Sequence, residues 1–217
     1  MTTSSILDLG NPEDSRSWTK GCEKLGINIV ASLFGTTPTL PQLTEFFRGS
    51  PEWVYFSGHF AGLALYNEGR VLVNIDFASD KIILQVGEAT KTLPKGADDL
   101  QLVKNCEVLV WGGCNACGPA GTVRTLRELF GNPLILGYAG STGWKINNAM
   151  LGGGFIKSAF FNRLGLERSA TTVRNAWMAT ANQGYGGGSI EGMFRAIDPD
   201  GQEWTLGKKK IVKGRKF

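Results

Sequence analysis

Two residues able to transfer protons and attack carbonyl groups occupy comparable positions in this 217-residue chain. His59, the only histidine, follows the apolar run 53–56, and Cys114 follows the apolar run 108–111. An imidazole can remove a thiol proton, and the resulting thiolate can attack a carbonyl carbon. A helix beginning shortly after Cys114 would lower the pKa of its thiol further. The pair therefore predicts acyl-transfer chemistry, with every His-dependent step passing through His59.

These residues must be positioned by the elements around them. Apolar runs rich in β-branched and aromatic residues alternate with helical patterns, which is typical of a largely parallel sheet covered by helices. Working residues in such sheets gather beyond the C-terminal ends of strands, and we expect the strands before His59 and Cys114 to be neighbours. The expected strands are 6–9, 27–34, 53–56, 108–111 and 133–139, and the expected helices lie near 39–47, 122–130, 155–164 and 170–182.

Two further regions depart from this alternation. Residues 63–87 show period-two segments separated by turn residues, which predicts an antiparallel meander inserted into the α/β scheme. A Gly-rich linker at 184–188 precedes a hairpin whose turn is 198–201. We expect one domain over residues 1–183, with the linker, hairpin and tail of 184–217 packed on it or extending it.

Composition and charge limit the classes of function. With 42% hydrophobic and 19% charged residues, the chain can build a core and is not disordered. The net charge is +4, but six positive charges fall within residues 208–217, so the remainder carries −2. No nucleic-acid motif accompanies this tail, which argues against a nucleic-acid partner and predicts a solvated end. The chain shows neither a secretion signal nor a membrane-length apolar run, so we expect a soluble, cytoplasmic protein.

The sequences around His59 and Cys114 resemble those of the caspase-like cysteine peptidases, which include caspases, metacaspases, and legumain-type and CHAT-domain enzymes. Residues 54–59 (VYFSGH) match the family's apolar strand ending in SGHG, and residues 108–114 (VLVWGGC) match its strand ending in a small residue and the nucleophilic cysteine. The histidine of caspases precedes the cysteine by about 50 residues, as here. The resemblance covers residues 5–165.

This resemblance implies a caspase-like catalytic domain: a mixed, mostly parallel sheet with flanking helices. It implies hydrolysis of a peptide bond, with Cys114 as nucleophile, His59 as base and then acid, and no cofactor or metal. Backbone N–H groups near Phe60 and Cys114 are the implied oxyanion donors. Phe60 stands where the family has glycine, which leaves an inactive scaffold or binding module of the same fold as the alternative.

The resemblance also suggests residues that contact substrate. In caspases, cations in the loops after the first strand and after the post-cysteine strand hold an acidic side chain; Arg16 and Lys145 fall in similar loops, and Trp144 can line a neighbouring pocket. Asp8 and the acidic pair 13–14 lie as near, and metacaspase-like relatives hold basic side chains instead. The expected partners are a protein or peptide substrate and a regulatory protein, since such enzymes are often inactive until processed or bound.

The cysteines permit two other interpretations. Cys114 and Cys117 form a CxxC at a strand-to-helix junction, as in thioredoxin-like oxidoreductases, although no cis-proline candidate follows. The sequence around Cys117 (116–118) also resembles the family's sequence around the nucleophile. Cys114 is preferred as the nucleophile, because it follows the apolar strand 108–111 after two residues, as in the family. A zinc site would need His59 and a fourth ligand such as Cys106 or Cys22, and CxxC alone supplies half a site. Four unevenly spaced cysteines favour reduced thiols over a disulfide scaffold.

Overall fold

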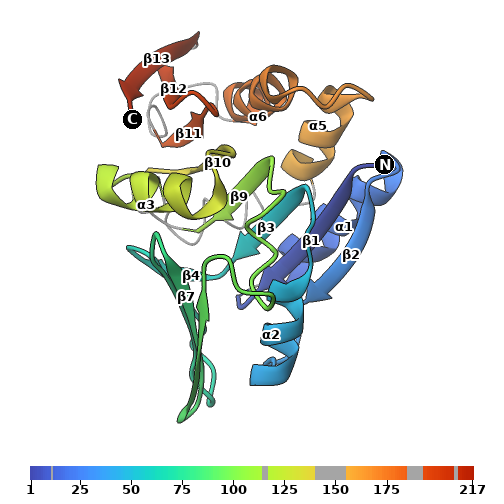
Figure 1. Cartoon of the computed structure of the whole chain (residues 1–217). Coiled ribbons are helices and arrows are strands. Elements are labelled where there is room, and N and C mark those ends of the chain that lie inside the picture. The colour runs from blue at the N-terminus through green and yellow to red at the C-terminus, as the bar shows by residue number, and fades with distance from the viewer. Residues whose placement is uncertain (11, 114–116, 140–154, 185–192, 208–209) are drawn as a thin grey trace.

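The structure is a computed structural model that describes residues 1–217 except 11, 114–116, 140–154, 185–192 and 208–209. At its centre is an eight-stranded sheet in the order β13-β12-β11-β10-β9-β3-β1-β2 (Figure 1). The parallel strands are β2 (Asn28–Leu33), β1 (Thr3–Asp8), β3 (Trp53–Ser57), β9 (Val108–Gly112) and β10 (Leu134–Tyr138). The antiparallel strands are β11 (Phe194–Ile197), β12 (Gln202–Gly207) and β13 (Lys210–Lys216). The expected mixed, mostly parallel sheet is confirmed.

The continuous apolar runs correspond to the strands at the centre of this sheet. Every residue of β3, β9 and β10 is buried, because helices or a second sheet cover both faces. The edge strand β2 instead alternates exposed and half-buried residues. Sequence runs and burial therefore agree that β3 and β9 lie in the interior.

One face of the sheet is covered by α1 (Pro12–Lys24), α5 (Phe155–Leu164) and α6 (Ala170–Gly184) (Figure 1). Trp18 of α1 is buried at the centre of this layer, with its ring 4.7 Å from Tyr55 and 5.0 Å from Phe161, measured between centroids. Gly21 permits this packing, since a Cβ there would lie 1.9 Å from the Phe161 ring. The sequence analysis did not predict α1, which is mostly polar.

The opposite face is covered by α2 (Leu40–Arg48), α3 (Ala120–Phe130) and a second sheet. Helix α2 begins at a capping box in which Thr39 and Gln42 satisfy each other's backbone N–H groups. Helix α3 ends at Gly131, whose φ of 73° is the left-handed conformation common after helices. These local signals explain why both helices could be predicted.

The second sheet is an antiparallel meander, and it is longer than the predicted 63–87. Its strands follow chain order: β4 (His59–Ala61), β5 (Ala64–Tyr66), β6 (Val73–Phe77), β7 (Lys81–Val86) and β8 (Ala89–Pro94). Its apolar face packs on the central sheet through Phe77, whose ring lies 5.3 Å from Phe56 and 4.8 Å from Trp111. The meander therefore begins directly after β3, at His59.

The basic tail differs from the expected solvated end. Residues 210–216 form β13, which pairs with β12 and extends the central sheet. Most of its side chains are exposed, but Arg215 is bound to the buried carboxylate of Glu203. A charge count could not reveal this pairing, because the acidic partner lies in the preceding strand.

No helix in the described part of the chain is both long enough and apolar enough to cross a membrane.

Candidate functional site

The strands that precede His59 and Cys114 are hydrogen-bonded neighbours. β3 and β9 run parallel, and their last paired residues are Ser57 and Gly112. His59 follows two residues after Ser57, and Cys114 follows two residues after Gly112. The predicted adjacency of the two strands is confirmed. Cys114 itself lies outside the described residues, which resume at Cys117.

Gly58 turns the chain from the central sheet into the meander. Its φ is 145°, and a Cβ there would lie 2.7 Å from Leu65 Cδ1. Both the conformation and the close approach favour glycine at this position. His59, expected in a loop just beyond the buried strand 53–56, is instead the first residue of β4.

The His59 side chain is accessible and lies beside a carboxylate. It is 45% exposed, and its Nε2 is 3.7 Å from Glu68 Oε2. Its ring centroid lies 5.7 Å from that of Tyr66, its cross-strand partner. Glu68 could not be predicted from the sequence, because only the register of the meander brings the 67–69 turn back to His59. The arrangement leaves the imidazole open to solvent and to a substrate.

Phe60 contacts the chain that leaves β9. Its ring centroid is 4.7 Å from that of Trp111, and a Cβ built on Gly113 would lie 1.6 Å from Phe60 Cδ2. The ring therefore occupies space that any side chain at Gly113 would need. This contact joins β4 to the segment that leads to Cys114.

Cys117, the second cysteine of the CxxC, is a buried thiol. It is fully buried, and burial raises its pKa to about 12. Its backbone N–H donates to the carbonyl of Tyr138 at 2.7 Å, and its Sγ lies where a Cβ on Gly137 would collide with it. A thiol in this environment remains protonated near neutral pH. Pro119 caps α3 shortly beyond it, so the expected helix after Cys114 is present.

The remaining cysteines lie elsewhere in the fold. Cys22 belongs to the core around Trp18, and Cys106 lies just before β9 at the other end of the sheet. Burial raises the pKa of both thiols, that of Cys22 to about 12. Within the described ranges, no three His, Cys, Asp or Glu side chains converge as metal ligands.

The predicted substrate contacts are only partly described. Arg16 is exposed on helix α1 rather than in a loop. Asp8, buried at the end of β1, joins this strand to the helix by accepting hydrogen bonds from the Gly10 N–H and the Ser15 hydroxyl, each at 2.7 Å. Trp144 and Lys145 lie outside the described residues.

Comparison with known proteins adds no family assignment. Neither a scan against protein-family models nor a search of curated proteins found a match. The chemistry of the site therefore rests on its own residues and geometry.

Proposed function

We propose that the protein is a caspase-like cysteine endopeptidase in which Cys114 is the nucleophile and His59 the base and then the acid. The observation that carries the proposal is the pairing of Ser57 with Gly112 at the ends of adjacent parallel strands. His59 comes two residues after Ser57 and Cys114 two residues after Gly112, and these are the two groups needed for acyl transfer. The mixed, mostly parallel sheet with helices on both faces is the architecture that the resemblance implies.

The proposed reaction needs only these two side chains, backbone donors and water. His59 takes the proton from Cys114 Sγ, and the thiolate forms a bond to the peptide carbonyl carbon. The C–N bond then breaks as His59 returns the proton to the leaving nitrogen. A water molecule that gives its proton to His59 next attacks the thioester, releasing the acid product, and Sγ regains the proton. The backbone N–H groups of Phe60 and Cys114 are the proposed donors to the oxyanion.

The strand pairing of β4 supports a role for the Phe60 N–H. β4 is the edge strand of the meander and is joined to β5 by the two-residue turn 62–63, closed by Ala61 and Ala64. In such hairpins the closing pair is hydrogen-bonded, and successive pairs alternate. Phe60, opposite Leu65, is then a non-hydrogen-bonded position. Its N–H points away from β5, toward the open edge of the sheet.

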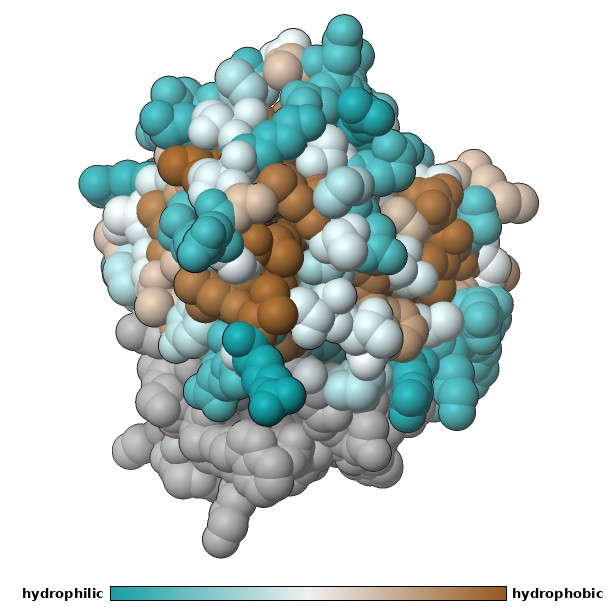
Figure 2. Space-filling view, turned by 90° about the horizontal axis from the view of Figure 1, so that it is seen from below, coloured by the Kyte–Doolittle hydropathy of each residue, from teal (hydrophilic) through white to brown (hydrophobic). Residues whose placement is uncertain are grey.

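The surroundings of His59 favour a polypeptide substrate. Its exposure provides an open site rather than an enclosed cavity for a small molecule. Figure 2 shows the molecule from below the view of Figure 1, and hydrophobic side chains gather on part of this face. A cavity of about 520 Å³ between Thr3, Glu52 and Glu107 lies instead at the opposite ends of the strands. An exposed site of this kind suits an extended peptide.

Further features of the proposal follow from the resemblance. Arg16, Trp144 and Lys145 are proposed to contact substrate side chains, and a regulatory protein or processing step is proposed to control the enzyme. The described cysteines are free, which fits a reducing compartment such as the cytoplasm.

Two other functions make different use of the same residues. An inactive scaffold is favoured by Phe60, which stands where the family has a glycine. Its ring fills the space beside Gly113. A CxxC oxidoreductase would have to use Cys114 as the attacking thiol, because Cys117 is completely buried and its pKa is raised. Both enzymes require an activated thiolate at Cys114, whereas the scaffold predicts an ordinary thiol there.

The deciding experiment measures the pH dependence of alkylation at each cysteine by mass spectrometry. The wild type is compared with His59→Ala and with Tyr66→Ala, which alters the same strand pair but keeps the imidazole. We expect rapid labelling of Cys114 well below pH 8, lost in His59→Ala and kept in Tyr66→Ala. Slow labelling of Cys114 in the wild type would refute the peptidase and favour the scaffold. Joint oxidation of Cys114 with Cys117 would favour the oxidoreductase.

A further inference from the structure

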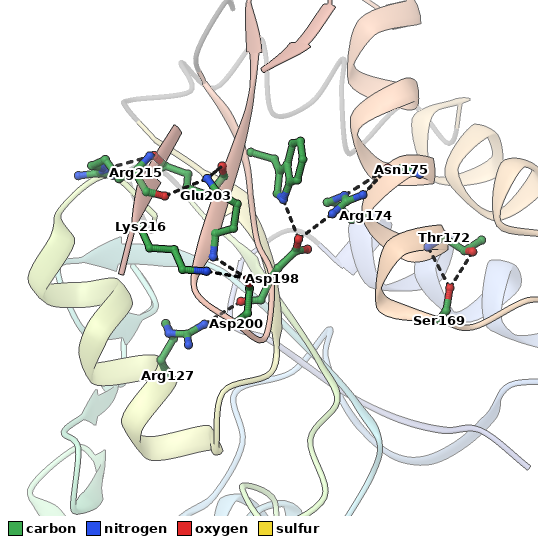
Figure 3. A network of polar contacts seen from close by, with 12 residues as sticks. Arg127, Ser169, Thr172, Arg174, Asn175, Asp198, Asp200, Glu203, Arg215 and Lys216 are labelled. Atoms are coloured by element: carbon green, nitrogen blue, oxygen red, sulfur yellow. Dashed lines mark hydrogen bonds and ion pairs between the residues drawn. The ribbon is translucent and has the colours of Figure 1, made fainter. Parts of the chain in front are cut away.

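A buried carboxylate links the C-terminal strand to the rest of the protein. The side chain of Glu203, in β12, is 3% exposed, and its Oε1 lies 3.1 Å from Arg195 Nε and 3.0 Å from Arg215 Nη2. Its Oε2 accepts from the Arg215 backbone N–H at 2.9 Å and from Nε at 3.2 Å (Figure 3). Burial alone would raise the pKa of Glu203, but the hydrogen bonds from Arg215 and the charge of Arg195 outweigh it and lower the pKa.

An irregularity in strand pairing creates this arrangement. The register of β12 and β13 shifts around Glu203, so that Gly214 and Arg215 together face one residue. Such a bulge redirects a side chain and leaves a backbone group without its ladder partner. The Glu203 carboxylate accepts that group, the N–H of Arg215. Gly214 is required for the approach, since a Cβ there would lie 2.4 Å from Glu203 Oε2.

Arg215 also reaches beyond its own sheet edge. Its Nη2 donates to the carbonyl of Gly118 at 3.0 Å. The preceding residue, Cys117, is bound through its N–H to Tyr138 at the end of β10. The last residue of the CxxC and the residue after it are therefore held from two sides, by β10 and by β13.

We infer that Arg215 is a positioning residue for the segment Cys117–Gly118. Glu203 fixes the guanidinium, and the guanidinium fixes the Gly118 carbonyl. Cys117 follows the proposed nucleophile by three residues in the sequence, so we expect loss of the clamp to change the reactivity of Cys114. This consequence for catalysis rests on the proposed function, whereas the clamp on Gly118 does not.

The buried thiols provide a direct test of the clamp. Cys117 reports opening of the clamped segment, while Cys22 and Cys106 report opening of other parts of the fold. We expect Arg215→Gln to increase alkylation of Cys117 at least about tenfold, because a hydrogen bond from a charged group is lost, with Cys22 and Cys106 unchanged. The matched control is Lys213→Gln, which removes the same charge from the same strand and lies over Trp204 instead.

A conservative variant separates charge from geometry. Arg215→Lys keeps a positive charge for Glu203 but has no planar fork to reach Gly118 as well. We expect Arg215→Lys to have a higher thermal stability than Arg215→Gln. Alkylation of Cys117 should be as fast in Arg215→Lys as in Arg215→Gln. Equal acceleration at all three buried cysteines, or protection of Cys117 in Arg215→Gln, would overturn the clamp.

The pH profile of Cys114 labelling tests the effect on the proposed site. In Arg215→Gln we expect this profile to shift toward higher pH, as it does when the thiol moves away from the imidazole. An unchanged Cys114 profile beside an exposed Cys117 would refute the positioning role. If Cys114 shows no activation even in the wild type, the peptidase proposal fails, and the Cys117 result still decides the clamp.

Discussion

The ring of Phe60 lies against the backbone of Gly113, at a place where a Cβ on the glycine would be 1.6 Å from Phe60 Cδ2. Phe60 directly follows the proposed base, and Gly113 directly precedes the proposed nucleophile. The ring also contacts Trp111, in the strand that leads to Gly113. The contact therefore joins the residue after the proposed base to the residue before the proposed nucleophile, in addition to the strand pairing of β3 with β9.

Replacing Gly113 with alanine tests this contact. We expect Gly113→Ala to lower the free energy of unfolding by about 1–3 kcal/mol, because the new methyl group must displace the Phe60 ring. Urea denaturation measures the change. The control Gly121→Ala lies in α3 with open space around it and should be neutral or slightly stabilising. If the double variant Gly113→Ala/Phe60→Leu regains stability, the clash with the Phe60 ring is the cause. A free energy of unfolding in Gly113→Ala equal to that of the wild type would contradict the prediction.

Glu68 is predicted to assist His59 weakly. Its carboxylate attracts the imidazolium that forms when the thiol proton is taken. Because the pair is exposed, we expect Glu68→Gln to slow Cys114 alkylation near neutral pH by only about two- to fivefold, less at high salt. The control is Glu88→Gln, in the exposed turn between β7 and β8. A loss as large as that in His59→Ala would show that Glu68 has a greater role than this geometry supports.

Acid is predicted to weaken the Glu203 cluster. The folded state lowers the pKa of Glu203 below its ordinary 4.5, so its contribution to stability is present above that pH and is lost as pH falls through the folded pKa. We expect Glu203→Gln to be about 3 kcal/mol less stable than the wild type at pH 7, since Arg195 loses its buried partner. Thermal unfolding from pH 7 to pH 3 should show this gap narrowing below about pH 4.

The control for this prediction is Asp200→Asn, which removes an exposed carboxylate that pairs with Lys216 in the same region. Its effect at pH 7 should be clearly smaller than that of Glu203→Gln. A constant gap between Glu203→Gln and the wild type at every pH would show that the carboxylate charge is not what stabilises the cluster.

Removing the second cysteine of the CxxC distinguishes the two proposed chemistries. We expect Cys117→Ala to keep the pH profile of Cys114 alkylation, because the buried Cys117 thiol takes no part in a Cys–His reaction. The cost should be about 1 kcal/mol of stability for the lost sulfur contacts. Cys106→Ala removes an equally inaccessible thiol before β9 and is the matched control. Accumulation of a mixed disulfide at Cys114 only in Cys117→Ala would favour dithiol exchange, in which the second thiol releases the first.

The elements with strong local signals could be predicted from sequence. The strands β3, β9 and β10 are uninterrupted apolar runs, and α2 has a complete capping box. Helix α1 was missed because it places few large apolar residues inward, chiefly Trp18 and Cys22, one helical turn apart. The beginning of the meander was also misplaced, since the turn at Gly58 depends on contact with Leu65. The residue pattern within one segment cannot predict features that depend on contacts with segments distant in the sequence.

The candidate site likewise has one feature that could be predicted from the sequence and others that could not. The adjacency of the strands before His59 and Cys114 follows from the general behaviour of parallel sheets and was predicted correctly. The approach of Glu68 to His59 depends on meander register, and the binding of Arg215 to Glu203 depends on a bulge. Both arise from pairing between segments, so neither leaves a recognisable spacing in the sequence.

The order of the strands has a final consequence for how the site is assembled. β3 belongs to the first part of the chain and β9 to the second, and the connection between them passes through the exposed Gly96, around which there is open space. A backbone break there would leave each fragment with one of the two proposed reacting groups. Neither fragment could carry out the proposed reaction alone, and it would return only when the fragments associate. The proposed site is therefore formed between two parts of one polypeptide, much as some active sites are formed between two subunits.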